Sequence, residues 1–180
     1  MSKRWHELAV RLPTDTDIAG IEVGVWRGTM SEELLSLCPR LTLLMVDRWR
    51  DVPDDHPYKA SNEQVCHASL RDMTDAMRQA AVRVARFGER AILIRAEANQ
   101  AAALLPDSAF GFVFLDCGFT YESITADLAL WWPKIKPGGL LCGHDWEHPT
   151  RGEVKRAVTD GLSGVEIETG KNTTWFARKA

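Results

Sequence analysis

The chain has 180 residues, of which 45% are hydrophobic and 26% are charged, and it carries a formal net charge of −3 at pH 7. This length and composition predict one globular domain, residues 1–180, and exclude a disordered chain. Because the sequence has no block of Lys and Arg and no apolar run of the ~20 residues that span a bilayer, we expect neither nucleic acid nor a membrane as a partner.

The cysteines and the amino-terminal segment indicate the cellular compartment of the protein. The four cysteines are scattered, with no C-x-x-C pair, so we expect reduced thiols rather than a disulfide framework. The first residues lack the apolar segment of a secretory signal, and residues 1–12 are predicted to form a short helix with Trp5, Leu8 and Leu12 on one face. Together these features predict a cytoplasmic protein.

Short β-branched apolar runs alternate with helical patterns along the chain, which predicts α/β units around a mostly parallel sheet. The predicted strands cover residues 21–25, 41–46, 91–95, 110–115 and 140–143. The predicted helices cover residues 29–37, 62–87, 99–105 and 121–132, and a last helix ends near Asp160. Two of these helices are expected to begin at a capping box, formed by Thr29 with Glu32 and by Thr150 with Glu153.

Two further segments complete the pattern. Residues 50–61, rich in Pro and Asp, are predicted to form a loop that could cover a substrate as a lid, with His56 and Tyr58 in it. Residues 165–169 and 174–178 are predicted to form a hairpin, because a Gly-Lys-Asn turn lies between them.

Acidic residues stand at or near the carboxyl ends of all five predicted parallel strands: Glu22, Asp47, Glu97, Asp116 and Asp145. In an open α/β sheet ligands bind beyond these ends. Gly24 and Gly28 follow the first strand, where glycines let the backbone turn tightly and approach a ligand. Asp47 could accept hydrogen bonds from two ribose hydroxyls. Each acid alone is explained equally well by a cap or a turn, but together they favour a nucleoside with a cationic centre over a phosphate-rich ligand.

Several stretches of the sequence match one family of enzymes: residues 21–28, 46–49, 94–98, 112–116 and 127–146. The last, with Lys136-Pro137-Gly138-Gly139 and Gly143-His144-Asp145-Trp146, is the most specific. Through them the chain resembles class I S-adenosylmethionine-dependent methyltransferases from end to end, in particular the compact group related to macrocin-type sugar O-methyltransferases. The resemblance implies a Rossmann-like methyltransferase fold: a mostly parallel seven-stranded sheet with a C-terminal antiparallel hairpin and helices on both faces.

The same resemblance implies S-adenosylmethionine as the cofactor and methyl transfer to a small-molecule acceptor, with a hydroxyl oxygen as the target by analogy. The expected cofactor-binding residues are Glu22, Gly24, Gly28, Asp47, Arg48, Ala96, Glu97 and Asp116. Of these, the first three would hold the methionine part, Asp47 would bind the ribose, Ala96 and Glu97 would face the adenine, and Asp116 would lie near the amino end of the cofactor.

The candidate catalytic residues are Asp145, Asp116 and His144. Methyl transfer requires alignment of donor and acceptor and removal of a proton from the acceptor. Asp145 is the candidate general base or metal ligand, and a cap on the turn into the next helix is its competing role. His144 is expected to orient or pack. His144 and His148 have an H-x-x-x-H spacing, but Pro149 favours a loop there over a zinc-binding helix.

The segment after the fourth predicted strand departs from the family pattern. Relatives usually carry Asp-Gly-Asp-His-Ser-Tyr where this chain has Asp116-Cys117-Gly118-Phe119-Thr120-Tyr121, so a second acid and a histidine are missing. Trp146 stands where Mg²⁺-using relatives carry a second acidic or amide residue. Two carboxylates, from Asp116 and Asp145, fall short of the oxygen ligands that a hard divalent cation takes. We therefore expect no metal, although Mg²⁺ completed by water and substrate stays open.

Four tryptophans raise a further question about the acceptor: Trp49, Trp131, Trp132 and Trp146. They could line an aromatic acceptor pocket, although the neighbouring pair at 131 and 132, on a helix beside the sheet, favours the core or an interface. A homodimer also stays open by analogy with related enzymes.

Two rival functions remain. A catalytically degenerate methyltransferase fold that binds the cofactor or a partner without turnover is favoured by the altered segment 117–119. An NAD-dependent oxidoreductase would explain the glycines and Asp47, but its fingerprint is G-x-G-x-x-G. Here Trp26 occupies the place of the middle glycine, which lets the backbone approach the pyrophosphate.

Overall fold

A seven-stranded sheet forms the centre of the protein in the computed structural model, which describes residues 3–60, 62, 64–148 and 152–180. The strands are β1 (Ile18–Val23), β2 (Leu41–Asp47), β3 (Ala91–Arg95), β4 (Phe110–Leu115), β5 (Ile135–Gly143), β6 (Ile167–Thr169) and β7 (Trp175–Arg178). Their order is β3-β2-β1-β4-β5-β7-β6; the first five run parallel, and β7 is antiparallel to both β5 and β6. This arrangement confirms the predicted fold class.

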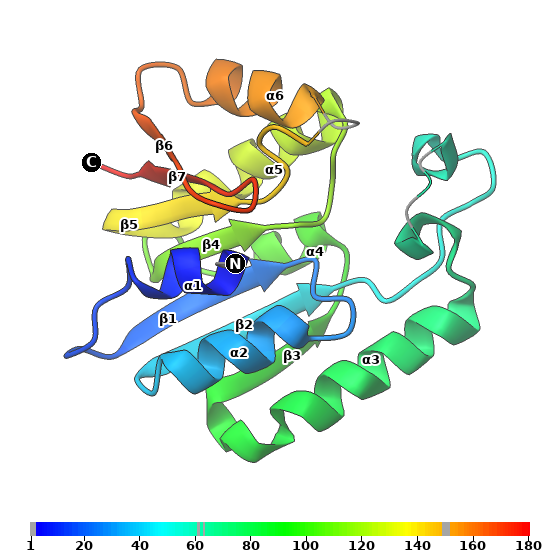
Figure 1. Ribbon diagram of the computed structural model, residues 1–180, viewed down its shortest axis with the longest axis horizontal. Helices are drawn as coiled ribbons and strands as arrows, with labels where there is room; N and C mark the ends of the chain where they lie inside the picture. The colour runs from blue at the N-terminus through cyan, green and yellow to red at the C-terminus, as the bar shows by residue number, and fades with distance from the viewer. Residues whose placement is uncertain (1–2, 61, 63, 149–151) are drawn as a thin grey trace.

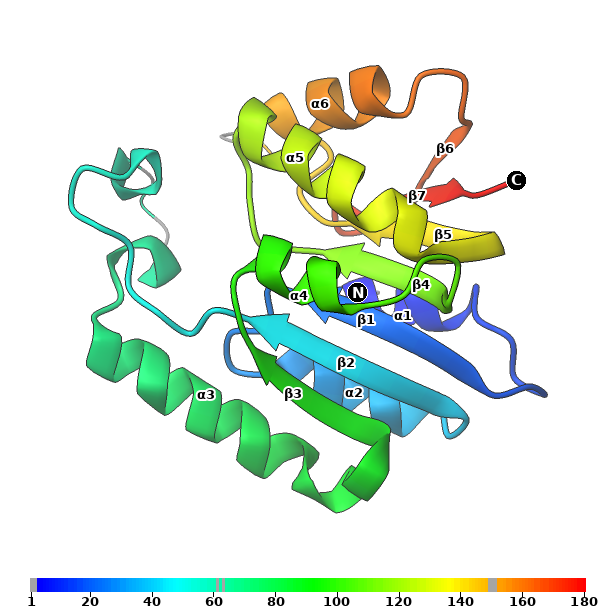
Figure 2. The same ribbon diagram turned by 180° about the vertical axis from the view of Figure 1, so that it is seen from behind.

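Helices cover both faces of the sheet (Figures 1 and 2). They are α1 (Arg4–Ala9), α2 (Thr29–Leu37), α3 (Leu70–Val84), α4 (Ala98–Leu104), α5 (Tyr121–Trp131) and α6 (Glu153–Gly161). Short 3-10 turns add η1 (Pro57–Ala60), η2 (Gln64–His67), η3 (Ala85–Arg90) and η4 (Trp132–Lys134). The first three α-helices contribute to one core cluster and the last three to the other. None of the helices in the described ranges is long and apolar enough to cross a membrane.

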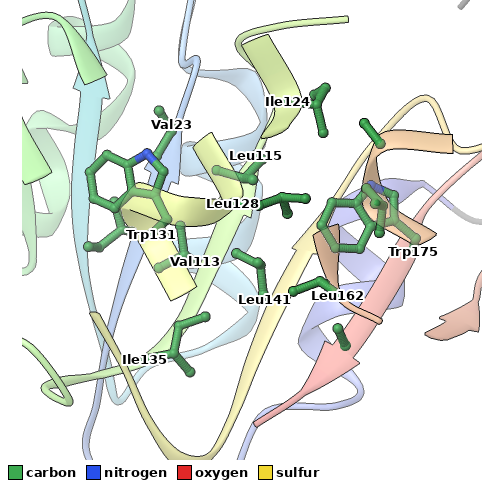
Figure 3. Packing of buried hydrophobic residues seen from close by; sticks show 14 of the residues in the cluster. Val23, Val113, Leu115, Ile124, Leu128, Trp131, Ile135, Leu141, Leu162 and Trp175 are labelled. Carbon is green, nitrogen blue, oxygen red and sulfur yellow. The ribbon is translucent and has the colours of Figure 1, made fainter. Parts of the chain in front are cut away.

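The two layers of helices bury opposite faces of the same strands. All of β4 is buried, with Phe112 facing the cluster of α1 to α3 and Val113 facing the cluster of α4 to α6. Figure 3 shows the second cluster, in which aliphatic side chains of β4, β5 and α5 gather with the indole rings of Trp131 and Trp175. A strand covered on both faces must be apolar throughout, which explains the continuous apolar run of β4.

The end of β1 and the start of α2 differ from the prediction. β1 ends at Val23 rather than at residue 25, because Gly24 turns the backbone with a φ of 93°. The predicted capping box of Thr29 with Glu32 is wrong. Gly28, with a φ of 73°, is the N-cap of α2, and Thr29 is already the first helical residue.

The predicted helix 62–87 is also wrong at both ends. α3 begins only at Leu70, because Ser69 and Asp72 form a capping box there. The Asp72 amide donates to Ser69 Oγ at 3.2 Å, and the Ser69 amide donates to Asp72 Oδ2 at 2.9 Å. Beyond α3 the chain tightens into η3, where Gly88 has a φ of 58°.

Two boundaries near the carboxyl terminus complete the comparison. β5 begins at Ile135, five residues before the predicted start, and the Pro-Gly-Gly stretch lies inside it at a register shift between Phe110 and Phe112 of β4. Thr150, the predicted cap of the last helix, lies outside the described residues. Both strands of the predicted terminal hairpin form and pair with each other, although they are shorter than expected.

Candidate active site

The carboxyl ends of β3, β2, β1, β4 and β5 meet at one edge of the sheet, and all five predicted acids lie there. Val23 pairs with Val46 on one side and with Leu115 on the other, and Leu115 pairs with Gly143. The η1 and η2 turns lie beyond this edge (Figure 1). The predicted site residues therefore share one region of the molecule, as expected from parallel strands.

Glu22 is the most deeply buried of these acids, with 1% of its surface exposed. Ser31 Oγ donates a hydrogen bond to its Oε2 at 2.5 Å. Burial raises the pKa of Glu22 to about 8; the Ser31 bond and the Arg4 charge oppose the shift, and the charges of Asp116 and Asp47 add to it. Glu22 is therefore largely protonated at neutral pH, and a cation beside it would favour its ionised form.

Asp47 shapes the loops around it. Its Oδ2 accepts from the amides of Val25 and Trp26 at 2.9 and 2.8 Å, and its Oδ1 accepts from the amide of Trp49 at 2.7 Å. Trp26 and Trp49 both have positive φ angles, of 47° and 40°, and the indole of Trp49 donates to the carbonyl of Trp26 at 2.7 Å. Three backbone donors hold Asp47 at the end of β2, a structural role that the sequence did not reveal.

Gly24 and Gly28 are needed for packing within the protein. A Cβ on Gly24 would lie 2.3 Å from the carbonyl oxygen of Asp116, and one on Gly28 would lie 2.9 Å from the Cα of Ala80 in α3. Both positions also require positive φ angles, which glycine adopts without strain. Their predicted approach to a ligand stays a prediction.

Arg48, Ala96 and Glu97 lie together at the ends of β2 and β3. The guanidinium of Arg48 is 3.9 Å from the carboxylate of Glu97 and donates to the carbonyls of Arg50 and Asp51 at 3.2 and 3.0 Å. The amide of Ala96 donates to the carbonyl of Asp47 at 3.1 Å. Glu97 is the N-cap of α4, and 45% of its side chain is exposed, so its carboxylate is open to a ligand.

Asp116, His144 and Asp145 form a compact group at the ends of β4 and β5. His144 Nδ1 lies 2.9 Å from Asp145 Oδ1 and 3.7 Å from Asp116 Oδ1. The Asp145 side chain is 5% exposed and that of His144 17%, so the imidazole is the more accessible of the two. One ligand atom from each residue lies within 4.8 Å of the others, a spacing compatible with a metal ion.

Arg4 also enters this group, and sequence reasoning missed it. Its Nη1 lies 3.0 Å from Asp116 Oδ2. Four strands lie between Arg4 and Asp116 along the chain. An arginine at the start of a short helix also belongs to no motif that would indicate such a contact.

The altered segment after β4 packs against the predicted lid. The rings of Phe119 and Tyr58 are stacked with centroids 4.5 Å apart, and His56 meets Tyr58 edge to face at 4.6 Å. Cys117 Sγ donates to Asp127 Oδ2 at 3.1 Å, inside the protein. Burial raises the pKa of Asp127 to about 6, and the Cys117 bond opposes that shift.

The tryptophans do not form an acceptor pocket. Trp49 is fully buried and Trp146 is 8% exposed, so the pocket hypothesis is wrong for these two. Trp131 is fully buried in the core, as its position on a helix beside the sheet favoured. Trp132 is half-buried and lines a hollow of about 340 Å³ beside α5 and α6. A second hollow, of about 160 Å³, lies at the opposite edge of the sheet near Gly111 and Gly138. Neither hollow contains a predicted site residue.

The sheet order, with its reversed last strand and acid-lined edge, is that of the class I methyltransferases. Residues 21–146 match the family model described as "Methyltransferase domain", and this stretch covers well over half of the chain. The chain therefore belongs to this methyltransferase family, which confirms the resemblance. No curated protein matches the chain.

Solved structures show the same fold at low identity. The O-methyltransferase NovP has a TM-score of 0.69 and 16% identity, with 98% of this chain and 79% of NovP covered. The calicheamicin methyltransferase CalS11 has a TM-score of 0.66 and 14% identity, covering 96% and 76%. A precorrin-6y C5,15-methyltransferase from Geobacter metallireducens has a TM-score of 0.66 and 14% identity, covering 100% and 90%. At these identities the likeness shows the fold alone.

Proposed function

We propose that this chain transfers a methyl group from S-adenosylmethionine to a hydroxyl oxygen of a small molecule. The observation that carries the proposal is the pair of His144 and Asp145 beside Asp116, at the sheet edge beyond which open α/β sheets bind ligands, in a chain that matches a methyltransferase domain. The O-methyltransferase NovP, which shares the fold, supports oxygen as the target by analogy only.

The side chains at this edge fit the chemistry of the cofactor. Glu22 and Asp116 suit its positively charged methionine part, and Gly24 and Gly28 form the turn beside it. Burial keeps Glu22 protonated in spite of the Arg4 charge, and a second cation beside it would favour the ionised carboxylate. When bound, S-adenosylmethionine supplies an electrophilic methyl group on a sulfonium sulfur.

The nucleoside part would lie towards β2 and β3. Three of the four lone-pair sites on the Asp47 carboxylate are taken by backbone amides, which leaves one for a ribose hydroxyl. The half-exposed carboxylate of Glu97, near Arg48 and Ala96, faces the place proposed for the adenine.

His144 is the proposed general base, and Asp145 positions it. His144 Nδ1 lies 2.9 Å from Oδ1 of the buried Asp145 carboxylate. In the proposed reaction Nδ1–H turns to donate to this carboxylate, and Nε2 takes the proton of the acceptor hydroxyl. Asp145 stabilises the imidazolium that this transfer creates. This assignment moves the base from Asp145, the first candidate from sequence, to its neighbour, because Asp145 is almost completely buried.

We further propose that the reaction needs no metal. Mg²⁺ prefers an all-oxygen shell, whereas this group offers two carboxylates and an imidazole, and one carboxylate already pairs with the Arg4 guanidinium. Residues 50–61 are the proposed lid, since Tyr58 is stacked on Phe119 at this edge.

Calorimetric titration with S-adenosylmethionine, its demethylated product and NAD, with and without Mg²⁺, tests the proposal. We expect the first two to bind and Mg²⁺ to change neither affinity. Binding of NAD instead would overturn the assignment, and a Mg²⁺ effect on affinity or turnover would restore the metal. Binding without methylation of any acceptor in a panel of small hydroxyl compounds, with a folded protein, would favour the hypothesis of a cofactor-binding protein without turnover.

A further inference from the structure

The amino-terminal helix places Arg4 at the proposed cofactor site. It is the first residue of α1, whose Leu8 is fully buried in the core cluster shared with α2. Its guanidinium reaches Asp116, with Nη1 3.0 Å from Oδ2, and its charge lowers the pKa of Glu22. The positive charge of Arg4 therefore acts on both acids assigned to the methionine part of the cofactor.

The guanidinium of Arg4 has more N–H donors than its ion pair with Asp116 uses. Among the residues that the structure describes, its Nε is buried and has no hydrogen-bond partner. A guanidinium has five N–H donors, and a buried donor without a partner is costly. Because 30% of the Arg4 side chain is exposed, an oxygen-bearing ligand that enters the site can approach this guanidinium.

Opposite charges at this place match an amino acid group. The carboxylates of Glu22 and Asp116 suit an ammonium and a sulfonium, and a guanidinium fork suits a carboxylate through two parallel hydrogen bonds. We propose that Arg4 binds the carboxylate of the amino acid end of S-adenosylmethionine, so that the amino-terminal helix forms part of the cofactor site. This inference rests on the proposed function.

Titration of matched ligands separates this role from general electrostatics. The ligands are S-adenosylhomocysteine, its decarboxylated analogue and 5′-methylthioadenosine, which lacks the whole amino acid end. The proteins are the wild type, Arg4→Met and Lys3→Met; the last removes an exposed charge next to Arg4. Circular dichroism and thermal unfolding establish that each variant is folded.

We expect Arg4→Met to weaken S-adenosylhomocysteine by roughly 10- to 100-fold, the range for a hydrogen bond to a charged group, and to leave the other two ligands within about twofold. Lys3→Met should bind all three like the wild type. Equal weakening of the carboxylate and decarboxylated ligands by Arg4→Met, or no weakening of either, would overturn the inference while leaving the cofactor assignment intact. If the wild type binds none of the three, the proposed function itself fails, and the role of Arg4 fails with it.

Discussion

The protonated, buried carboxyl of Glu22 makes the stability of the protein depend on pH in a defined direction. Its pKa rises from 4.5 to about 8 on folding, so between these values the folded state holds a proton that the unfolded chain has lost. The free energy of unfolding must then fall as pH rises through this window. At about 1.4 kcal/mol per pH unit, the loss attributable to Glu22 is at most about 5 kcal/mol.

Glu22→Gln is the matched perturbation, because an amide has the shape of the protonated carboxyl and does not ionise. Urea unfolding of both proteins at one-unit steps from pH 5 to pH 9, at constant ionic strength, gives their difference in unfolding free energy. Asp127 also loses a proton near pH 6, but it is common to both proteins and cancels in that difference. We expect the variant to gain stability relative to the wild type by about 1 kcal/mol per pH unit between pH 5 and pH 8.

Binding of the cationic cofactor extends the same argument. A cation beside Glu22 favours its ionised form, so binding at pH 7 should release a proton from the wild type and not from Glu22→Gln. The calorimetric enthalpy would then depend on the ionisation enthalpy of the buffer for the wild type alone. Parallel pH profiles of stability for the two proteins, together with buffer-independent enthalpies, would refute the assignment of a protonated Glu22.

Three further variants test the remaining parts of the site. His144→Asn should lower turnover by about 10²- to 10⁴-fold with cofactor affinity within twofold, and wild-type turnover would exclude His144 as the base. Gly28→Ala should lower the free energy of unfolding by about 1–3 kcal/mol, because its Cβ would lie 2.9 Å from the Cα of Ala80 at a φ of 73°; Gly152→Ala, with nothing within 4 Å, is the control. Tyr58→Ala should raise KM for the acceptor and leave cofactor affinity unchanged if residues 50–61 act as a lid, and an unchanged KM would contradict that role.

The parts of the fold that the sequence predicts best are short apolar runs with turn residues on both sides. β3 and β4 lie at the predicted residues, because an apolar run between turn residues leaves no other choice of period or boundary. The start of α3 was missed, because the apolar stripe continues upstream of Leu70 and only the capping contacts of Ser69 with Asp72 decide where the helix begins. The end of β1 was missed because the backbone turns at Gly24, and the amides of Val25 and Trp26 then donate to Asp47 of β2 instead of continuing the strand.

Part of the candidate site could likewise be predicted from the sequence, and part could not. Parallel strands bring their carboxyl ends to one edge, so the acids that follow them could be gathered from sequence alone. Side-chain packing across distant elements decides which carboxylate lies against His144. The same kind of packing brings Arg4 to Asp116. No local pattern carries that information.

The two roles of Asp47 can be separated without a mutation. Replacing it would release the amides of Val25, Trp26 and Trp49, so any variant mixes loss of the loop with loss of ribose binding. A change in the ligand avoids this difficulty. If a remaining lone pair of Asp47 accepts from a ribose hydroxyl, the intact protein should bind the 2′,3′-dideoxy analogue of S-adenosylhomocysteine roughly 10- to 100-fold more weakly than the parent. Equal affinities would mean that Asp47 serves the loops alone, and the ribose would then need another partner at the ends of β2 and β3.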